Sequence, residues 1–297
     1  MVTPMSARIA RWPEGEPLTT FGSLAEFLNR SEDVAGNISI THGAKPIQLR
    51  WLDKNASTTL VLFTAAVHWN VKTVPVFSGH RTTTDVDANV LMISDPALEI
   101  DTDLTLGWYA GSAEHPTLQQ DLTDIITSLS RDSRIVLFGG SGAGYPALEQ
   151  SLRLPDCTAL LVNPLTHVNL VERDIVRKYF KYAWNTTRPD DPYAAPFNNS
   201  VIDDYSEPVQ AQVICIQNIR DDYHIDHYWQ PFLDKLHPSN RVHTRYPNVG
   251  PGHATPDKQS MTRLFDTAVA HADWEELVAA IEALEITGPN QSARAGK

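Results

Sequence analysis

The sequence reads FGGSGAGYPAL around Ser141, directly after the apolar segment RIVL. Residues that could assist a serine nucleophile follow later in the chain. Asp221, Asp222 and Asp226 lie in RDDYHID, and His253 lies in GPGHATPD. A serine is a weak nucleophile until a base takes its proton, and the base needs an acid that orients it. The order serine, acid, histidine therefore predicts acyl-transfer chemistry through a catalytic triad.

A glycine cluster after a strand has other uses, and two of them involve nucleotides. A phosphate-binding loop needs a lysine after its last glycine, but Tyr145 follows Gly144. A dinucleotide fingerprint fits Gly142, Gly144 and Ala147, yet the next strand-like segment ends in Asn163 instead of an acid. Both nucleotide interpretations are weaker than the nucleophile interpretation.

The nucleophile interpretation requires a tight turn between a strand and a helix. Small residues must stand two positions before and after the serine, and Gly139 and Ala143 do so. We expect Ser141 to have a strained backbone with positive φ, and the N–H of Gly142 to face a developing oxyanion. A glycine-rich turn whose serine merely caps a helix would look similar. The acid and the histidine that follow favour the nucleophile.

The elements that would position these residues alternate between strands and helices. Apolar strand-like runs alternate with amphipathic segments such as TLQQDLTDIITSLSR, which predicts an α/β fold with helices on both faces of the sheet. We expect a mostly parallel sheet of roughly eight strands. The predicted strands are 37–42, 46–52, 58–67, 89–96, 134–140, 157–164, 209–218 and 241–247. Ser141, the acidic segment and His253 each follow a strand, so they should meet at one edge of the sheet.

The domain organisation follows from the same rhythm. Residues 1–36 are expected to form an N-terminal extension, and residues 37–285 a single domain. The stretch 164–208 is much longer than an ordinary crossover connection, which predicts a cap insertion. Residues 286–297 have the composition of a flexible tail.

These motifs resemble those of the α/β-hydrolase superfamily over residues 37 to 285. The resemblance implies that Ala65 or Ala66 supplies a second oxyanion-hole N–H, where relatives often carry a His-Gly pair. Aligning QNIRDD with the acid loop of such proteins selects Asp221 as the triad acid, with Asp222 as the alternative. A second resemblance, to bacterial hydrolase-like proteins of surface-polysaccharide and accessory-secretion pathways, rests on SDPALE, LGWYAGS and IQNIRDDYHIDHYWQPF.

Three further side chains are candidates for a substrate pocket. Trp108 and Tyr109 follow a predicted strand, although an aromatic pair packed under a loop would look the same. His224 lies close to Asp221 in sequence. The segment DDYHIDH could also hold a metal, but an acidic first turn of a helix, favoured by the helix dipole, is the better explanation. We therefore expect no metal and no organic cofactor.

Composition excludes some partners. A net charge of −12 with no strongly basic segment argues against nucleic acid. Two cysteines in apolar runs predict a reducing, cytoplasmic location, and no secretory signal or membrane span is expected. The oligomeric state is left open.

The function predicted from the sequence is that of a serine hydrolase acting on a small-molecule or carbohydrate acyl ester. An acyltransferase with the same triad, for instance one that transfers an O-acetyl group to a carbohydrate, is an alternative. A non-catalytic binding protein that keeps the fold is another.

Overall fold

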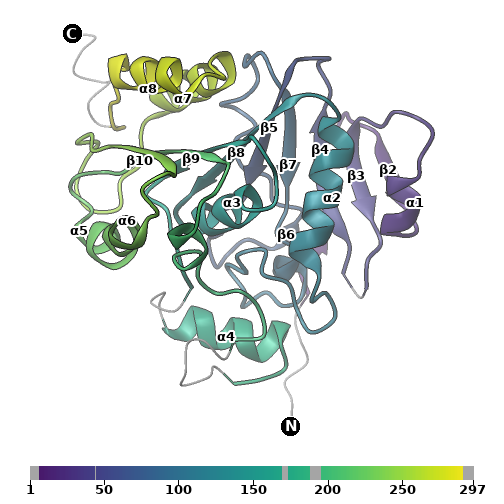
Figure 1. Cartoon of the computed structure of the whole chain (residues 1–297). Helices are drawn as coiled ribbons and strands as arrows, with labels where there is room; N and C mark the ends of the chain where they lie inside the picture. The colour runs from purple at the N-terminus through teal and green to yellow at the C-terminus, as the bar shows by residue number, and fades with distance from the viewer. Residues whose placement is uncertain (1–6, 44, 169–172, 188–194, 290–297) are drawn as a thin grey trace.

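A nine-stranded sheet forms the centre of the protein in a computed structural model that describes residues 7–43, 45–168, 173–187 and 195–289 (Figure 1). Its strand order is β11-β10-β9-β8-β5-β7-β4-β3-β2. The strands are β2 (Leu18–Phe21), β3 (Gly36–Ile40), β4 (Ile47–Leu52), β5 (Thr58–Phe63), β7 (Asn89–Ile93), β8 (Arg134–Gly140), β9 (Thr158–Val162), β10 (Gln212–Ile216) and β11 (Arg241–Arg245). Every residue of β5, β7 and β9 is buried, as their continuous apolar runs predict.

The prediction of a mostly parallel sheet of about eight strands needs two corrections. The sheet is mixed, because β4 runs antiparallel to both of its neighbours, β3 and β7. The link between β3 and β4 is a short hairpin, which is too short for the crossover that parallel pairing requires. The ninth strand is β2, which comes from the predicted N-terminal extension and pairs with β3. The alternating exposure of its four residues leaves no strong apolar signal.

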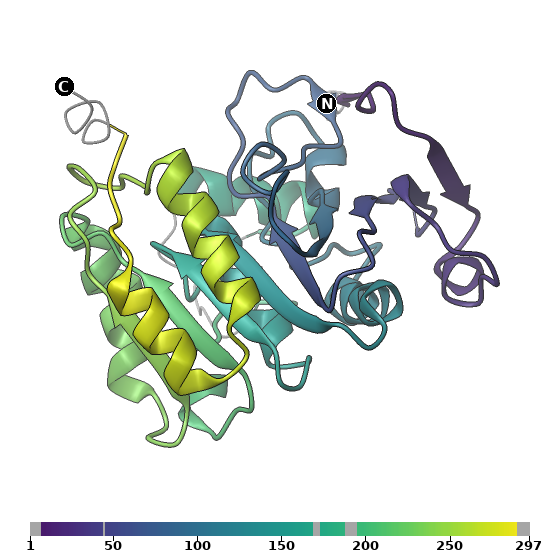
Figure 2. The ribbon, with the colours of Figure 1, turned by 90° about the horizontal axis from the view of Figure 1, so that it is seen from above.

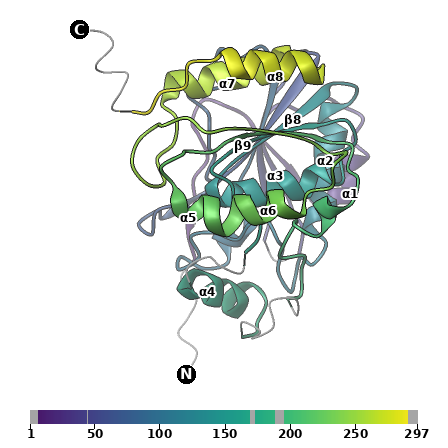
Figure 3. The same ribbon diagram turned by 60° about the vertical axis from the view of Figure 1, so that its left-hand side comes forward.

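Helices cover both faces of the sheet, as expected. On one face lie α7 (Lys258–Ala270) and α8 (Trp274–Ala283), and Figure 2 shows them crossing the half of the sheet that holds the later strands. On the other face lie α2 (Leu118–Ser130), α3 (Gly144–Ser151) and α6 (Gln230–Lys235) (Figure 3). The helix α2 turns Leu122, Ile125 and Ile126 into the core, as its periodicity predicts. The described part of the chain also has two short helices, α1 (Leu24–Leu28) and α5 (Asp222–His224), and the longer helix α4.

The helix α4 (Arg173–Ala183) belongs to the predicted insertion 164–208 and stands apart from both helix layers (Figures 1 and 3). The hydroxyl of Tyr179 donates to the carbonyl of Gly111 at 2.6 Å. The N–H of Ala113 donates to the carbonyl of Ala183 at 2.8 Å. These bonds fasten α4 to the loop that follows β7. Residues 169–172 and 188–194 of the insertion lie outside the described part of the chain.

The N-terminal residues are joined to the rest of the protein by Arg8, whose side chain is buried. Directly after Arg8, the two-residue strand β1 (Ile9–Ala10) pairs with β6 (Thr73–Val74). The guanidinium of Arg8 donates to five backbone carbonyls in the loops after β5 and β7, those of Val71, Leu98, Asp101, Thr102 and Leu104. At the other end, the hydroxyl of Thr287 donates to Asp257 at 2.7 Å. The predicted tail therefore begins with packed residues, and its last eight, 290–297, lie outside the described residues. Within the described residues, no helix has the length and apolar character needed to cross a bilayer.

Candidate active site

Ser141 stands on a sharp turn between β8 and α3 and has φ of 52°. Such a conformation is strained in a residue other than glycine, and the sequence predicted it. The turn needs small neighbours because the chain doubles back on itself. A Cβ at Gly139 would collide with the carbonyl of Ala143, and a Cβ at Gly144 would collide with the ring of Pro164. By contrast, a Cβ at Gly140 would meet its nearest atom at 3.8 Å.

Backbone N–H groups that could stabilise an oxyanion lie on two segments. Gly142 lies in the helical turn Ser141–Ala143. It packs closely against Leu106, and a Cβ at Gly142 would lie only 2.7 Å from a Leu106 methyl carbon, so the position has no room for a side chain. After β5, Val67 N–H donates to a loop carbonyl at 2.8 Å. Ala65 and Ala66 donate no backbone hydrogen bond to any described residue. Both N–H groups therefore remain candidates for the second oxyanion donor.

A buried carboxylate shapes the loop that brings Leu106 against Gly142. Asp95 accepts hydrogen bonds from the N–H groups of Ala97 and Gly107 at 3.0 Å and from that of Tyr109 at 3.3 Å. Burial raises the pKa of Asp95 to about 6, although the three N–H donors act in the opposite direction. This role was not predicted from the sequence, because a single aspartate after a strand is common in loops.

The acid and the base of the predicted triad meet directly. Asp221 Oδ2 lies 2.5 Å from His253 Nδ1, and the carboxylate is almost fully buried while the His253 side chain is 38% exposed. Asp222, the alternative acid, is exposed in the first turn of α5. Between the two candidates, the structure thus brings Asp221 to the histidine. With Nδ1 donating to the carboxylate, His253 Nε2 is left as the proton acceptor.

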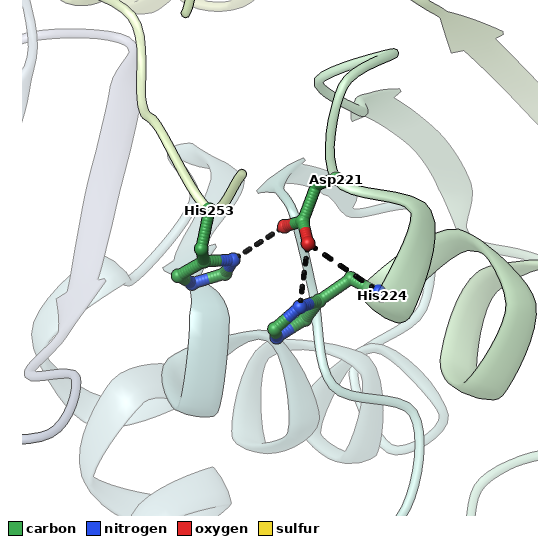
Figure 4. A group of neighbouring side chains, drawn as sticks. All are labelled: Asp221, His224 and His253. Carbon is green, nitrogen blue, oxygen red and sulfur yellow. Dashed lines mark hydrogen bonds and ion pairs between the residues drawn. The ribbon is translucent and has the colours of Figure 1, made fainter. Parts of the chain in front are cut away.

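A second imidazole shares the same carboxylate (Figure 4). His224 Nδ1 lies 3.1 Å from Asp221 Oδ1, and the His224 backbone N–H lies 3.4 Å from the same oxygen. The rings of His224 and His253 stack with centroids 3.9 Å apart and planes 21° from parallel. Burial lowers the pKa of His224, and the neighbouring His253 lowers it further. Asp221 acts in the opposite direction. His224, predicted to line a substrate pocket, therefore lies against the acid and the base.

Two buried asparagines connect the loop between β11 and α7, which carries His253 and is called the base loop below, to the ends of β9 and β10. Asn218, just after β10, donates from Nδ2 to the carbonyls of Gly250 and Gly252 at 2.9 and 2.6 Å and accepts from Val249 N–H at 3.2 Å. Asn163, just after β9, donates to the carbonyl of Ala254 at 2.8 Å and accepts from Asn218 N–H at 2.7 Å. Both side chains are 1% exposed. The sequence prediction missed these roles, although a polar residue closing an apolar strand was a usable signal.

The serine turn joins this network through the chain that follows Asn163. Leu165 N–H donates to the carbonyl of Ser141 at 3.0 Å, so the segment 163–165 contacts both the serine turn and the base loop. Among the described residues, no hydrogen bond joins the Ser141 hydroxyl to His253. Bonds between nucleophile and base are often long without substrate and shorten when it binds. The three predicted residues thus stand on neighbouring loops at one edge of the sheet.

Trp108 and Tyr109, the other predicted pocket residues, have fully buried side chains. The Tyr109 hydroxyl accepts from Thr64 N–H at 2.7 Å and donates to the carbonyl of Ile93 at 2.6 Å. Trp108 packs edge-on against Tyr179 of α4. The structure therefore gives both side chains the packing role that was the alternative.

Asp221, His224 and His253 are also the described residues that come nearest to a metal site, with one donor atom each within 4.8 Å of one another. Chelation requires lone pairs that converge on one point. The two stacked rings direct their Nδ1 atoms almost in parallel at the two oxygens of one carboxylate. This arrangement suits two N–H donors on a carboxylate better than a metal ion.

Comparison with known proteins was made by sequence and by structure. No family model matches the chain, and no curated protein matches it by sequence. Similar solved structures include a capsule O-acetyltransferase of Neisseria meningitidis serogroup A, at 15% identity and a TM-score of 0.61, covering 82% of this chain and 99% of that one. An S-formylglutathione hydrolase from Agrobacterium tumefaciens has 9% identity and a TM-score of 0.54, covering 84% and 99%. An acylaminoacyl peptidase from Pyrococcus horikoshii has 11% identity and a TM-score of 0.54, covering 86% and 45%.

The fold is of the α/β-hydrolase type. This confirms the fold that the sequence resemblance implied. The capsule O-acetyltransferase also agrees with the resemblance to surface-polysaccharide proteins. At these identities the similarity establishes the α/β-hydrolase fold, and the chemistry must be argued from the residues of this chain.

Proposed function

We propose that the protein is a serine hydrolase that acts on a small acyl ester through Ser141, His253 and Asp221. One observation carries the proposal above the others. The buried Asp221 carboxylate lies 2.5 Å from His253 Nδ1 at the edge of the sheet where Ser141 stands on a strained turn. A carboxylate on Nδ1 fixes the tautomer in which Nε2 can accept a proton.

In this mechanism the Ser141 hydroxyl attacks the ester carbonyl while His253 Nε2 takes its proton. The N–H of Gly142, and that of Ala65 or Ala66, stabilise the oxyanion of the tetrahedral intermediate. Collapse of this intermediate leaves an acyl-enzyme, and His253 returns the proton to the departing alcohol. A water molecule, deprotonated by the same imidazole, then releases the acid. This chemistry needs no metal or organic cofactor.

The experiment is covalent labelling with a fluorophosphonate probe, which reacts with activated serines. The wild type should be labelled and Ser141→Ala should not, whereas Ser239→Ala, at an exposed serine, should be labelled like the wild type. Circular dichroism establishes that each protein is folded. A folded wild type without label, or undiminished labelling of Ser141→Ala, would refute the proposal. The first of these results would favour a binding protein that keeps the fold.

A second candidate is an acyltransferase that uses the same three residues. The similarity to a capsule O-acetyltransferase favours it, and one structure of that protein is a complex with CoA. In a transferase, a sugar hydroxyl would take the place of water in the second step. Residues 164–208 would serve as a cap that keeps water from the acyl-enzyme.

The two reactions are distinguished by the fate of the acyl group. The protein is supplied with acetyl-CoA or p-nitrophenyl acetate, with and without a carbohydrate that offers free hydroxyls. A hydrolase yields acetate in both conditions. A transferase yields an O-acetylated sugar and little acetate.

A further inference from the structure

We propose that His224 is a positioning residue that fixes the Asp221 carboxylate and the plane of the His253 ring. This inference rests on the proposed function of Ser141, His253 and Asp221, and it assigns to the site a fourth side chain outside that triad. It concerns a residue that accepts no proton from the serine and contacts no reacting atom.

His224 and His253 share one carboxylate. Asp221 uses Oδ2 for His253 Nδ1 at 2.5 Å and Oδ1 for His224 Nδ1 at 3.1 Å. The second oxygen also lies 3.4 Å from the His224 backbone N–H. Because both oxygens are engaged, the carboxylate cannot rotate about its last bond without losing a partner. Each hydrogen bond that His224 gives to the charged group therefore stabilises the orientation that His253 requires.

The rings of His224 and His253 are also stacked on each other. His253 lies in a loop rich in glycine and proline, and more than a third of its side chain is exposed. The ring of His224 is parallel to it within 21° and lies 3.9 Å away, and its own side chain is only 13% exposed. A buried ring against a partly exposed one forms a wall that limits rotation of the exposed ring.

The helical segment that carries His224 is itself held by residues from another part of the chain. It precedes a π-helical turn, Ile225–Trp229, and packs against the ring of Tyr228 at 5.2 Å. A π-helical turn leaves carbonyls without their usual partners, and such turns are frequent at functional sites. Thr166 Oγ1 donates to the carbonyl of Tyr228 at 2.9 Å, and His167 Nε2 lies 3.0 Å from the carbonyl of His227. The segment after β9 thus supports the turn that presents His224.

The charge state of His224 agrees with a positioning role. Burial and, after it, the neighbouring His253 lower the pKa of its imidazole, which favours the neutral form of the ring. The groups that face it are Asp221, His253 and, on its own helical segment, Tyr223, His227 and Tyr228. An imidazolium at this distance would oppose the positive charge that His253 acquires when it takes the serine proton. A neutral ring donates to the carboxylate without that cost.

The test compares His224→Ala with His224→Asn, because the Nδ2 of asparagine can occupy the place of Nδ1 and donate to Asp221. The labelling rate with fluorophosphonate is measured, together with kcat and KM for p-nitrophenyl acetate. We expect His224→Ala to lower the labelling rate and kcat about tenfold, with KM within about twofold, since the loss is that of a hydrogen bond to a charged group. We expect His224→Asn to recover most of the rate. His227→Ala, at an exposed ring on the same turn, is the matched control and should behave as the wild type.

Three outcomes would overturn the proposal while the wild type still labels at Ser141. His224→Ala could have the labelling rate and kcat of the wild type. His224→Asn could be as impaired as His224→Ala. His224→Ala could be as inactive as His253→Ala, which would make His224 the base.

If the wild type does not label, the proposed function fails separately. The Nδ1 proton resonance of His253 still tests the positioning role. It should lie far downfield in the wild type and His224→Asn, and shift or vanish in His224→Ala. An unchanged resonance in His224→Ala would refute the role.

Discussion

The asparagine at the end of β10 offers the sharpest test of how the site is held. Replacing Asn218 by alanine removes three bonds to the loop that carries His253: two donations to the carbonyls of Gly250 and Gly252 and one acceptance from Val249 N–H. It also removes a longer local bond from Arg220 N–H, at 3.4 Å. At about 1 kcal/mol for each bond, the three bonds to the loop amount to roughly 3 kcal/mol, and buried groups left without partners can add to it. We therefore expect Asn218→Ala to lower both the free energy of unfolding and kcat, the latter by at least about tenfold.

The chain contains a matched control for this change. Asn240 also makes three side-chain bonds to backbone groups, with the carbonyls of Tyr205 and Glu207 and the N–H of Val209, at 2.8 to 2.9 Å. It lies before β11, at the opposite end of the strand from the base loop. Asn240→Ala should lose similar stability in urea denaturation and keep its kcat for p-nitrophenyl acetate. Equal losses of kcat in the two variants would refute the view that Asn218 acts on the site in particular.

Three more outcomes are expected. Gly139→Ala should abolish fluorophosphonate labelling because the new Cβ meets backbone inside the serine turn, whereas Gly140→Ala should label normally; labelling of both would contradict the steric argument. For Asp95, the pKa raised from 3.8 to about 6 means that the protonated form stabilises the fold at low pH and that this contribution is lost as pH rises through about 6. The unfolding free energy of the wild type relative to Asp95→Asn should thus fall by up to about 3 kcal/mol between pH values of about 4 and 6, and a constant difference would refute it. Arg8→Ala removes five hydrogen bonds to carbonyls and should lower the free energy of unfolding by roughly 3–5 kcal/mol. Arg11→Ala, at an exposed arginine, should lower it by about 0.5 kcal/mol or less. Similar losses in the two variants would count against the role of Arg8.

The strands of the sheet were predictable where burial leaves a mark on the sequence. All eight predicted strands are present. The central strands β5, β7 and β9 were marked most clearly, because a strand covered on both faces must be apolar at nearly every position. The strand β2 was missed since it lies at an edge, with half of its residues exposed. Antiparallel pairing of β4 depends on which strands become neighbours, and the apolar pattern does not encode that.

The serine turn was predictable for a local reason, and Asp221 and His253 from their order along the chain, whereas the groups that hold them in place were not predicted. The small residues around Ser141 record a steric demand within a few positions of the serine itself. The roles of Asn163 and Asn218 depend on contacts with residues more than thirty positions away. The stacking of His224 on His253 depends on a π-helical turn that no local pattern announced. Chain order alone could place Asp221 near His253, but only the folded geometry separates it from Asp222.

The network of Asn163 and Asn218 also bears on how the site opens. The amides of Leu165, Asn218 and Val249 donate to acceptors on three different segments, and each of these bonds depends on the others being in place. Groups linked in this way tend to exchange their amide hydrogens with solvent together, in one cooperative opening event. The serine turn and the base loop would then open and close together. Molecules in which only one of the two segments is ordered would be rare.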